Sequence, residues 1–181
     1  MTTPVLAIDC RFASSIGGLG TYTRSLVSAL VTQHAHNTQY VLFVSSKEEE
    51  WLSPLVSLPS VTIVRLPVPH YSLREQLIFP LLLWKYGCTQ LFAPHFNIPL
   101  LASIPITMTV HDLILHRYPN THSWFRRIAY RLLFALAVLK AGSIITITEH
   151  TKNDLLSYYG WKTSSTLHTI YPAATVQPSS F

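Results

Sequence analysis

Short apolar runs alternate along this chain with longer stretches in which apolar residues recur every three or four positions. The short runs are rich in β-branched residues, and most are continuously apolar, as strands of a parallel sheet covered on both faces are. The longer stretches have the period of amphipathic helices. The alternation predicts an α/β domain with a doubly wound, open sheet of six or seven mainly parallel strands.

The same pattern predicts where each element lies. Strands are expected at Val5–Ile8, Tyr40–Val44, Val61–Leu66, Gln90–Ala93, Ile106–Val110 and Ile144–Thr148, with a seventh at Leu167–Ile170. Helices are expected at residues 20–34, 47–53, 72–86, 123–141 and 150–159. Ser72 and Glu75 form a capping box in which each side chain bonds the other's backbone amide. Thr151 and Asp154 form a weaker helix-start signal.

Length and composition exclude several classes of protein. With 181 residues, 49% hydrophobic and 12% charged, the chain can bury a sizeable core and is too apolar for disorder. Its N-terminus lacks the features of a signal peptide. The densest apolar runs, Leu77–Trp84 and Leu132–Leu139, are shorter than the roughly 20 residues that span a bilayer. Two cysteines, Cys10 and Cys88, are too few for a disulfide framework and fit a reducing cytoplasm.

The net charge of +5 is confined to one part of the chain. Residues 76–148 contain six basic side chains and a single acidic one, Asp112, whereas the segments on either side have no net charge. A local excess of this kind indicates an anionic partner at one place on the molecule. Nucleic acid is disfavoured because no nucleic-acid-binding motif is present.

Much of this charge falls in the helix expected at residues 123–141. The stripe expected to pack on the sheet consists of Phe125, Ile128, Leu132, Leu136 and Leu139. The solvent side would then carry Arg126, Arg127 and Arg131 beside Tyr130 and Phe134. Two interpretations of this side stay open: a solvated basic face, and a face that binds an anionic membrane surface.

Polar and glycine residues gather where the predicted strands end, which is the edge at which open parallel sheets bind ligands. Gly17, Gly18 and Gly20 follow the first strand and precede a helix. They could let backbone amides approach an anion at the helix N-terminus, or they could serve only a tight turn. The spacing is not that of a G-x-G-x-x-G dinucleotide fingerprint.

His111 and Asp112 follow the fifth strand directly. Such a pair can orient a hydroxyl or carry out general acid–base chemistry, with Asp112 fixing the tautomer of a nearby imidazole. Two alternatives are a merely structural pair and a metal site completed by His116, although the spacing is not that of a zinc-binding H-E-x-x-H. The remaining histidines without a motif are expected on the surface: His34, His36, His70, His122 and His168.

Several ordered motifs resemble the N-terminal half of family 4 glycosyltransferases. They are Gly18–Leu26, Pro94-His95, Thr109–Leu113 with Pro119, Ile144–Leu155, and Ile170-Tyr-Pro172. The resemblance implies a Rossmann-like domain that is one half of the GT-B architecture. In that family the first domain binds the acceptor, the second binds a nucleotide-sugar donor as co-substrate, and transfer retains anomeric configuration without a required metal or further cofactor.

Carried onto this chain, the resemblance assigns roles to individual residues. The donor diphosphate would lie against the loop of Gly17, Gly18 and Gly20, and the transferred sugar near the catalytic pair His111 and Asp112. The residues expected at the cleft edge or acceptor site are His95, Asn97, Glu149 and Lys152. The sequence departs from the family pattern at Thr148, His150, Thr151 and Ala173.

The resemblance also predicts the organisation of the protein. Residues 1–171 would form the N-terminal domain and residues 172–181 the start of an interdomain linker, with the donor-binding domain absent. The leading hypothesis is an acceptor-binding half that is inactive alone and acts in polysaccharide biosynthesis on a glycan or lipid-linked acceptor, in the cytoplasm or at the inner membrane face. Its partners would be a donor-binding domain or subunit, a nucleotide-sugar and an anionic membrane. The alternatives are a non-catalytic subunit of a split glycosyltransferase and a small metal-dependent hydrolase.

Overall fold

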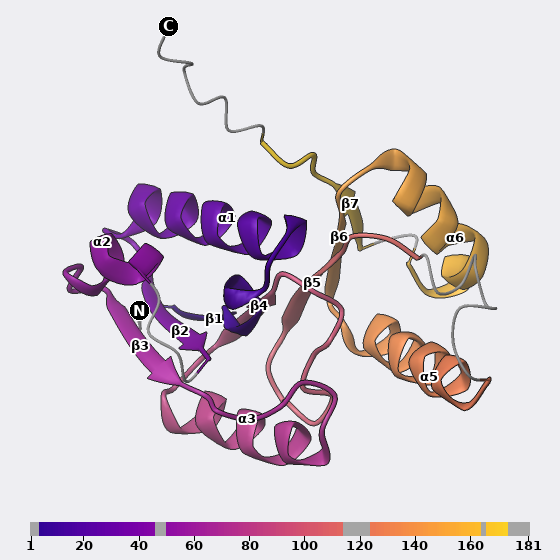
Figure 1. The fold of residues 1–181 in the computed structure, drawn as a ribbon, viewed down its shortest axis with the longest axis horizontal. Helices are drawn as coiled ribbons and strands as arrows, with labels where there is room; N and C mark the ends of the chain where they lie inside the picture. The colour runs from indigo at the N-terminus through magenta and orange to yellow at the C-terminus, as the bar shows by residue number, and fades with distance from the viewer. Residues whose placement is uncertain (1–3, 46–49, 114–123, 164–165, 174–181) are drawn as a thin grey trace, which may run out of the picture.

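The computed structural model describes residues 4–45, 50–113, 124–163 and 166–173. Their strands form one seven-stranded sheet, which helices cover (Figure 1). All neighbouring strands are parallel, in the order β3-β2-β1-β4-β5-β6-β7. The strands are β1 (Val5–Asp9), β2 (Gln39–Val44), β3 (Val61–Arg65), β4 (Gln90–Ala93), β5 (Ile106–Val110), β6 (Ser143–Thr146) and β7 (Leu167–Thr169). The predicted doubly wound sheet is confirmed, and each strand ends within two residues of its expected bounds.

Helices connect the strands much as the periodicity predicts. They are η1 (Arg11–Ser14), α1 (Gly18–His34), η2 (Glu50–Leu52), α2 (Ser53–Val56), α3 (Leu73–Lys85), α5 (Trp124–Lys140) and α6 (Glu149–Thr163). The helix expected at 47–53 falls partly outside the described residues, and its described part is η2 with the first residue of α2. The backbone of α6 departs from helical geometry at Tyr159, where that helix was expected to end.

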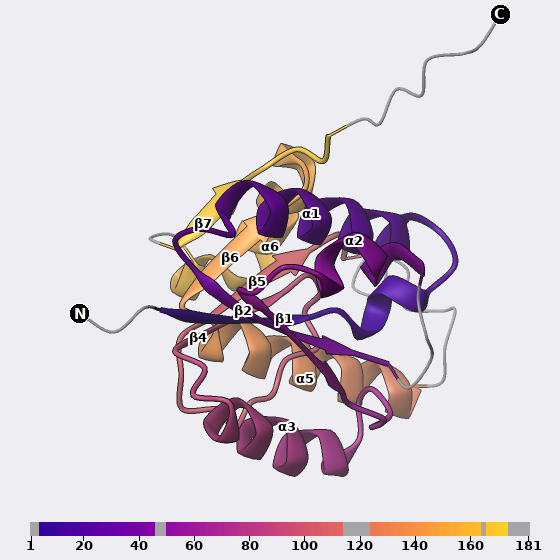
Figure 2. The ribbon, with the colours of Figure 1, turned by 90° about the vertical axis from the view of Figure 1, so that its left-hand side faces the viewer.

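Two hydrophobic clusters cover the two faces of the sheet. Val27 of α1 belongs to one cluster, and Phe79 of α3 and Phe134 of α5 belong to the other. Successive residues of a strand point to opposite faces, so that Ala7 packs in the α3–α5 cluster and Ile8 in the α1 cluster. Figure 2 shows α1 and α2 above the sheet, with α3 and α5 below it. Both faces are therefore covered, as continuously apolar strands require.

The face of α5 that packs on the sheet is not the predicted one. The side chains that pack inward are Tyr130, Phe134, Ala137 and Val138. The residues of the predicted stripe whose side chains are described are instead between 39% and 58% exposed: Ile128, Leu132, Leu136 and Leu139. The inward face is selected by ring packing, because Phe134 lies 5.1 Å from Phe96 and 5.5 Å from Tyr159 between ring centroids.

Two helix starts differ from the sequence signals. In α3, Ser72 Oγ accepts a hydrogen bond from the Glu75 amide at 3.2 Å, as the capping box predicts. The Glu75 carboxylate, however, accepts from the amide of Tyr71 at 2.8 Å rather than completing the box at Ser72. The cap of α6 is Thr148, whose Oγ accepts from the Thr151 amide at 3.0 Å, so α6 begins before the predicted signal.

The strand order changes direction between β1 and β4, since the chain first winds outward through β2 and β3 and then returns to the other side of β1. A doubly wound sheet leaves a crevice at the carboxyl ends of the strands on either side of this point. No helix within the described ranges has the length and apolar character needed to cross a membrane.

Candidate functional site

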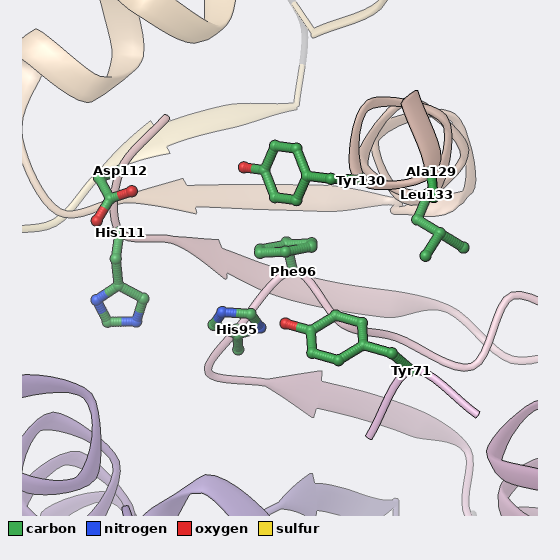
Figure 3. A pocket seen from close by; sticks show the side chains of 8 residues that line it. All are labelled: Tyr71, His95, Phe96, His111, Asp112, Ala129, Tyr130 and Leu133. Carbon is green, nitrogen blue, oxygen red and sulfur yellow. The ribbon is translucent and has the colours of Figure 1, made fainter. Parts of the chain in front are cut away.

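Two cavities meet at the carboxyl ends of the strands. The α1 cavity, of about 920 Å³, lies against the first turns of α1 and the segment Ile170–Ala173. The α5 cavity, of about 630 Å³, is lined by Tyr71, His95, Phe96, His111, Asp112, Ala129, Tyr130 and Leu133 (Figure 3). Three residues line both cavities: His95, His111 and Asp112. The end of β5 therefore forms the junction between them.

His111 is held at this junction in one orientation. Its Nε2 lies 2.8 Å from the Pro94 carbonyl oxygen, and its ring is perpendicular to the Tyr22 ring, with 4.8 Å between the centroids. A carbonyl can only accept, so Nε2 carries the proton and Nδ1 keeps a lone pair. Burial lowers the pKa of His111 by more than the Pro94 carbonyl and Asp112 raise it. The neutral ring can therefore accept a hydrogen bond, and Pro94 fixes its tautomer in place of Asp112.

His95 is a second neutral imidazole at the same edge. Its Nδ1 accepts a hydrogen bond from the Asn97 amide at 3.1 Å. Burial, together with the neighbouring His111 and His70, lowers the pKa of His95 to about 3. Its ring lies against Phe96, 4.3 Å away between centroids. His95 thus presents an uncharged, aromatic surface to both cavities.

A run of neighbouring rings continues from His95 through Phe12 to His70. Phe12 of η1 lies 4.5 Å from the His95 ring and 3.9 Å from the His70 ring. His70 is half-buried, and burial lowers its pKa. The prediction that His70 is an ordinary surface residue is therefore wrong.

Backbone geometry requires glycine at two of the three glycine positions after β1 and not at the third. Gly17 has φ of +104°, in the region that favours glycine. A Cβ on Gly20 would lie 1.9 Å from the Ser15 carbonyl oxygen, so only glycine allows this turn to pack against α1. A Cβ on Gly18 would meet nothing within 4 Å, and Gly18 lines the α1 cavity. Gly18 is therefore the position at which a ligand could approach the backbone at the positive end of α1.

A buried ionic cluster lies behind the site and was not predicted. Arg11 binds Asp9 through two nitrogens, at 2.8 and 2.6 Å, and Glu75 at 2.5 Å. All three side chains are almost fully buried, and the guanidinium lies 5.0 Å from the centre of the Phe79 ring. Burial disfavours the charge on Arg11, but the two carboxylates outweigh it and raise the Arg11 pKa. The cluster ties the end of β1 to the start of α3.

Glu75 extends this cluster to the wall of the α5 cavity. Its carboxylate accepts hydrogen bonds from the Asn97 amide group at 2.8 Å and from the Tyr71 backbone amide at 2.8 Å. Tyr71 has φ of 59°, which is unusual for a residue other than glycine. Burial and the nearby Glu75 raise the pKa of Tyr71 to about 12. Glu75 therefore holds Tyr71 in a strained backbone conformation, with its ring at the cavity (Figure 3).

The structure brings together only part of the predicted site. Asp112 lies with His111 at the junction, but the side chain of Asn97 turns inward to Glu75 and lines neither large cavity. Glu149 and Lys152 pair with each other at 3.4 Å and are not among the lining residues. A hydrogen bond from Thr169 and the proximity of Lys152 lower the Glu149 pKa. Thr151 instead connects α6 to the site by donating to the His111 carbonyl at 3.1 Å.

The predicted arginines lie on α5, and Arg127 and Arg131 are not among the residues that line either cavity. Arg131 is exposed and Arg127 half-buried, and the side chain of Arg126 lies outside what the structure describes. His116, the third member of the proposed metal site, also falls outside the described residues. Within those residues, no group of three histidine, cysteine or carboxylate side chains could hold a metal ion.

The sequence analysis missed the aromatic wall of the α5 cavity. The leucine stripe predicts Tyr130 on the solvent side, but the spacing of Tyr130, Phe134, Val138 and Ala141 is itself a helical apolar stripe and marks the inward face. Phe96 follows His95 at a strand end, which was a second available signal. Tyr71 precedes the Ser72 cap, and nothing in the local sequence marks it.

Comparison with known proteins identifies the family. The sequence profile of glycosyltransferase family 4 matches residues 16–177. The fold is similar to that of HepE from Anabaena, solved in complex with UDP and glucose, with a TM-score of 0.59 and 14% sequence identity. The alignment covers 98% of this chain and 48% of HepE, so the chain spans about half the length of that protein. A search of curated proteins finds no match. The seven-stranded α/β domain corresponds to half of a GT-B enzyme, and the chain belongs to glycosyltransferase family 4.

Proposed function

We propose that this chain is the acceptor-binding half of a retaining glycosyltransferase, which moves a sugar from a nucleotide-sugar donor to a glycan or lipid-linked acceptor. Residues 1–171 would form the N-terminal domain and residues 172–181 would begin the linker to a donor-binding half. The observation that carries the proposal is the junction at His111, where two cavities of different character share His95, His111 and Asp112. A transfer reaction needs two substrates to meet at one point.

The α1 cavity suits the donor side. Gly18 leaves the backbone accessible there, at the positive end of α1, which favours an anionic diphosphate. The likeness to a protein solved with UDP and glucose supports a nucleotide-sugar as the ligand. UDP-glucose is therefore the first donor to test.

The α5 cavity suits the acceptor. Its aromatic rings offer flat apolar surfaces, and Figure 3 shows the hydroxyl ends of Tyr71 and Tyr130 turned toward the side where His95 and Asp112 lie. Rings stack on the apolar faces of sugars, while hydroxyls and carboxylates bond the sugar edges. His111 would accept a hydrogen bond from a sugar hydroxyl through Nδ1 and so orient the sugar to be transferred.

The chain alone would not catalyse sugar transfer. Sugar transfer requires stabilisation of the negative charge that develops on the leaving diphosphate. In the described residues, the α1 cavity is lined by no lysine or arginine, so that stabilisation would come from the donor-binding half. Cys10 and Cys88 are buried and form no disulfide with each other, in keeping with a cytoplasmic location.

The test is sugar transfer from radiolabelled UDP-glucose by the chain alone and by the chain with its donor-binding half, on the same polypeptide or as a second chain. Soluble oligosaccharides and a membrane lipid fraction serve as separate acceptor pools. We expect transfer only with both halves present, and its loss in His111→Ala. His34→Ala is the matched control, because His34 is exposed at the far end of α1. Equal activity of wild type and His111→Ala would contradict the proposal.

A second candidate is a non-catalytic subunit that binds and regulates a separate catalytic chain. It is favoured by the lining of the α1 cavity, which among the described residues holds no lysine or arginine to stabilise a leaving diphosphate. The same reconstitution separates the two functions, since a passive subunit would change the rate of its partner without any dependence on His111.

A further inference from the structure

The outward face of α5 carries large apolar side chains. Trp124, Ile128 and Leu132 are each more than half exposed, and Leu136 and Leu139 continue the row. These residues recur every three or four positions, so they share one side of the helix, opposite Phe134 and Ala137. A helix that packs on a sheet normally exposes polar residues on this side. The α5 row therefore has no role in the core.

The outward face of α3 has the same character. Leu73 is 85% exposed, Trp84 83%, Leu81 63% and Leu77 61%. Their spacing again places them on one side of the helix, away from Phe79 and Leu83, which pack inside. We call the two outward rows together the apolar face.

The two rows belong to neighbouring elements. Gln76 of α3, Leu100 of the β4–β5 connection and Leu133 of α5 line one small hollow, so α3 and α5 flank that connection. Leu101 of the connection is itself 62% exposed. Both helices lie on the same side of the sheet (Figure 2). No residue of the apolar face lines the α1 or the α5 cavity.

The charges beside the apolar face have one sign. Arg74 and Lys85 of α3 and Arg131 of α5 are exposed, and Arg127 and Lys140 are half-buried. The only acidic residue of the two helices is Glu75, which is buried with Arg11. Two copies of such a face would repel one another, whereas an anionic surface would attract either.

We propose that the apolar face docks the protein on an anionic lipid bilayer. Its leucines and isoleucine would enter the boundary between headgroups and acyl chains, with Trp84 and Trp124 at the level where indole rings favour the interface. The basic side chains would meet the lipid phosphates. Docking itself is independent of sugar transfer; only its use, presenting the α5 cavity to a lipid-linked acceptor, rests on the proposed function.

This inference changes the membrane hypothesis drawn from the sequence. That hypothesis relied on Arg126, Arg127 and Arg131 on a face with Tyr130 and Phe134. Phe134 is buried and Tyr130 faces the α5 cavity. The apolar contribution comes instead from the leucines expected in the core and from α3.

The experiment is flotation of the 181-residue chain with vesicles of phosphatidylcholine alone or mixed equally with phosphatidylglycerol. We expect binding to the mixed vesicles that weakens as salt is added, and little binding to phosphatidylcholine alone. The double variant Leu77→Glu/Leu132→Glu should lower the affinity by about tenfold or more. Val56→Glu is the matched control, since Val56 is 62% exposed, lies on α2 on the opposite face of the sheet, and should bind as wild type does.

Both positions in the double variant are exposed, so folding should be retained and can be checked by circular dichroism. Arg74→Glu/Lys85→Glu tests the charge without altering the apolar row and should also reduce binding. The inference is overturned if wild type ignores the mixed vesicles, or if Val56→Glu weakens binding as much as the double variant. It is also overturned if sedimentation reveals a dimer that Leu77→Glu/Leu132→Glu dissociates, because the apolar face would then bind a second copy.

Discussion

The α1 cavity and the α5 cavity share three residues but differ in what forms the rest of their walls. Beside α1 the wall includes the first turn of a helix capped by Gly17, which has no side chain to offer, so the helix end presents its main-chain amides there. Polar side chains of the same helix, Thr21, Tyr22 and Ser25, also line that wall. Beside α5 the wall is made of rings, and one of them, Tyr71, is held by Glu75 in the buried cluster with Arg11. The α1 cavity therefore depends on the backbone at the start of α1, and the α5 cavity depends on a buried side-chain network. Substitutions at the two cavities should have different effects on stability and on binding.

The largest expected effect is a loss of stability when the buried ionic cluster behind the α5 cavity is broken. Arg11→Met would leave the carboxylates of Asp9 and Glu75 buried beside one another without their cation. Removing one partner from a buried ion pair costs about 3–5 kcal/mol, so we expect a loss of that size in the free energy of unfolding measured with urea. Arg74→Met, at an exposed position of α3, is the matched control and should change stability by less than about 0.5 kcal/mol. A small loss for Arg11→Met would mean that the network does not support the α5 side.

The next largest effect distinguishes Gly20 from Gly18 at the α1 cavity by the stability of their alanine variants. Gly20→Ala places a Cβ against the Ser15 carbonyl oxygen, which forces a backbone shift and should cost about 1–3 kcal/mol in unfolding free energy. Gly18→Ala meets no atom and should leave stability within about 0.5 kcal/mol of wild type, while raising KM for the nucleotide-sugar in the enzyme with both halves. If both variants lost equal stability, Gly18 would also be a structural glycine, and the backbone argument for the donor side would fail.

The smallest effect at neutral pH concerns His95. Its pKa is about 3 in the folded chain and 6.5 as a free side chain. Between these values the unfolded chain binds a proton that the folded chain does not, so stability should fall as pH falls below about 6.5. His95→Gln removes this contribution. We expect the variant to lose less unfolding free energy than wild type between about pH 8 and pH 5. Glu75, whose pKa burial raises, acts in the opposite direction but is common to both proteins. Parallel pH profiles would show that His95 is not buried as described.

The strands could be predicted closely because most of them are covered on both faces and therefore read as apolar runs. The two sides of α5 could not be told apart in this way. Leu132 and Leu136 are more apolar than Tyr130, so hydrophobicity alone turns the leucines inward. What decides the orientation is ring packing of Phe134 on Phe96, a contact between distant segments.

The site residues divide in the same way, because those that depend on contacts between distant segments leave no local signal in the sequence. His111, Asp112 and Gly18 could be found because strand ends of a parallel sheet meet at one edge. The second role of Glu75 could not, since its local signal as a capping residue is complete without Arg11, which lies 64 residues away in the sequence. Tyr71 depends on Glu75 and was hidden for the same reason.

The central claim is that the two cavities serve two substrates that meet at His111. It is tested most directly by steady-state kinetics of the enzyme with both halves, with donor and acceptor varied in turn. We expect Gly18→Ala to raise KM for the nucleotide-sugar alone, Tyr130→Phe to raise KM for the acceptor alone, and His111→Ala to lower kcat with either substrate saturating. If Gly18→Ala and Tyr130→Phe raised KM for the same substrate, the division between the two cavities would be wrong.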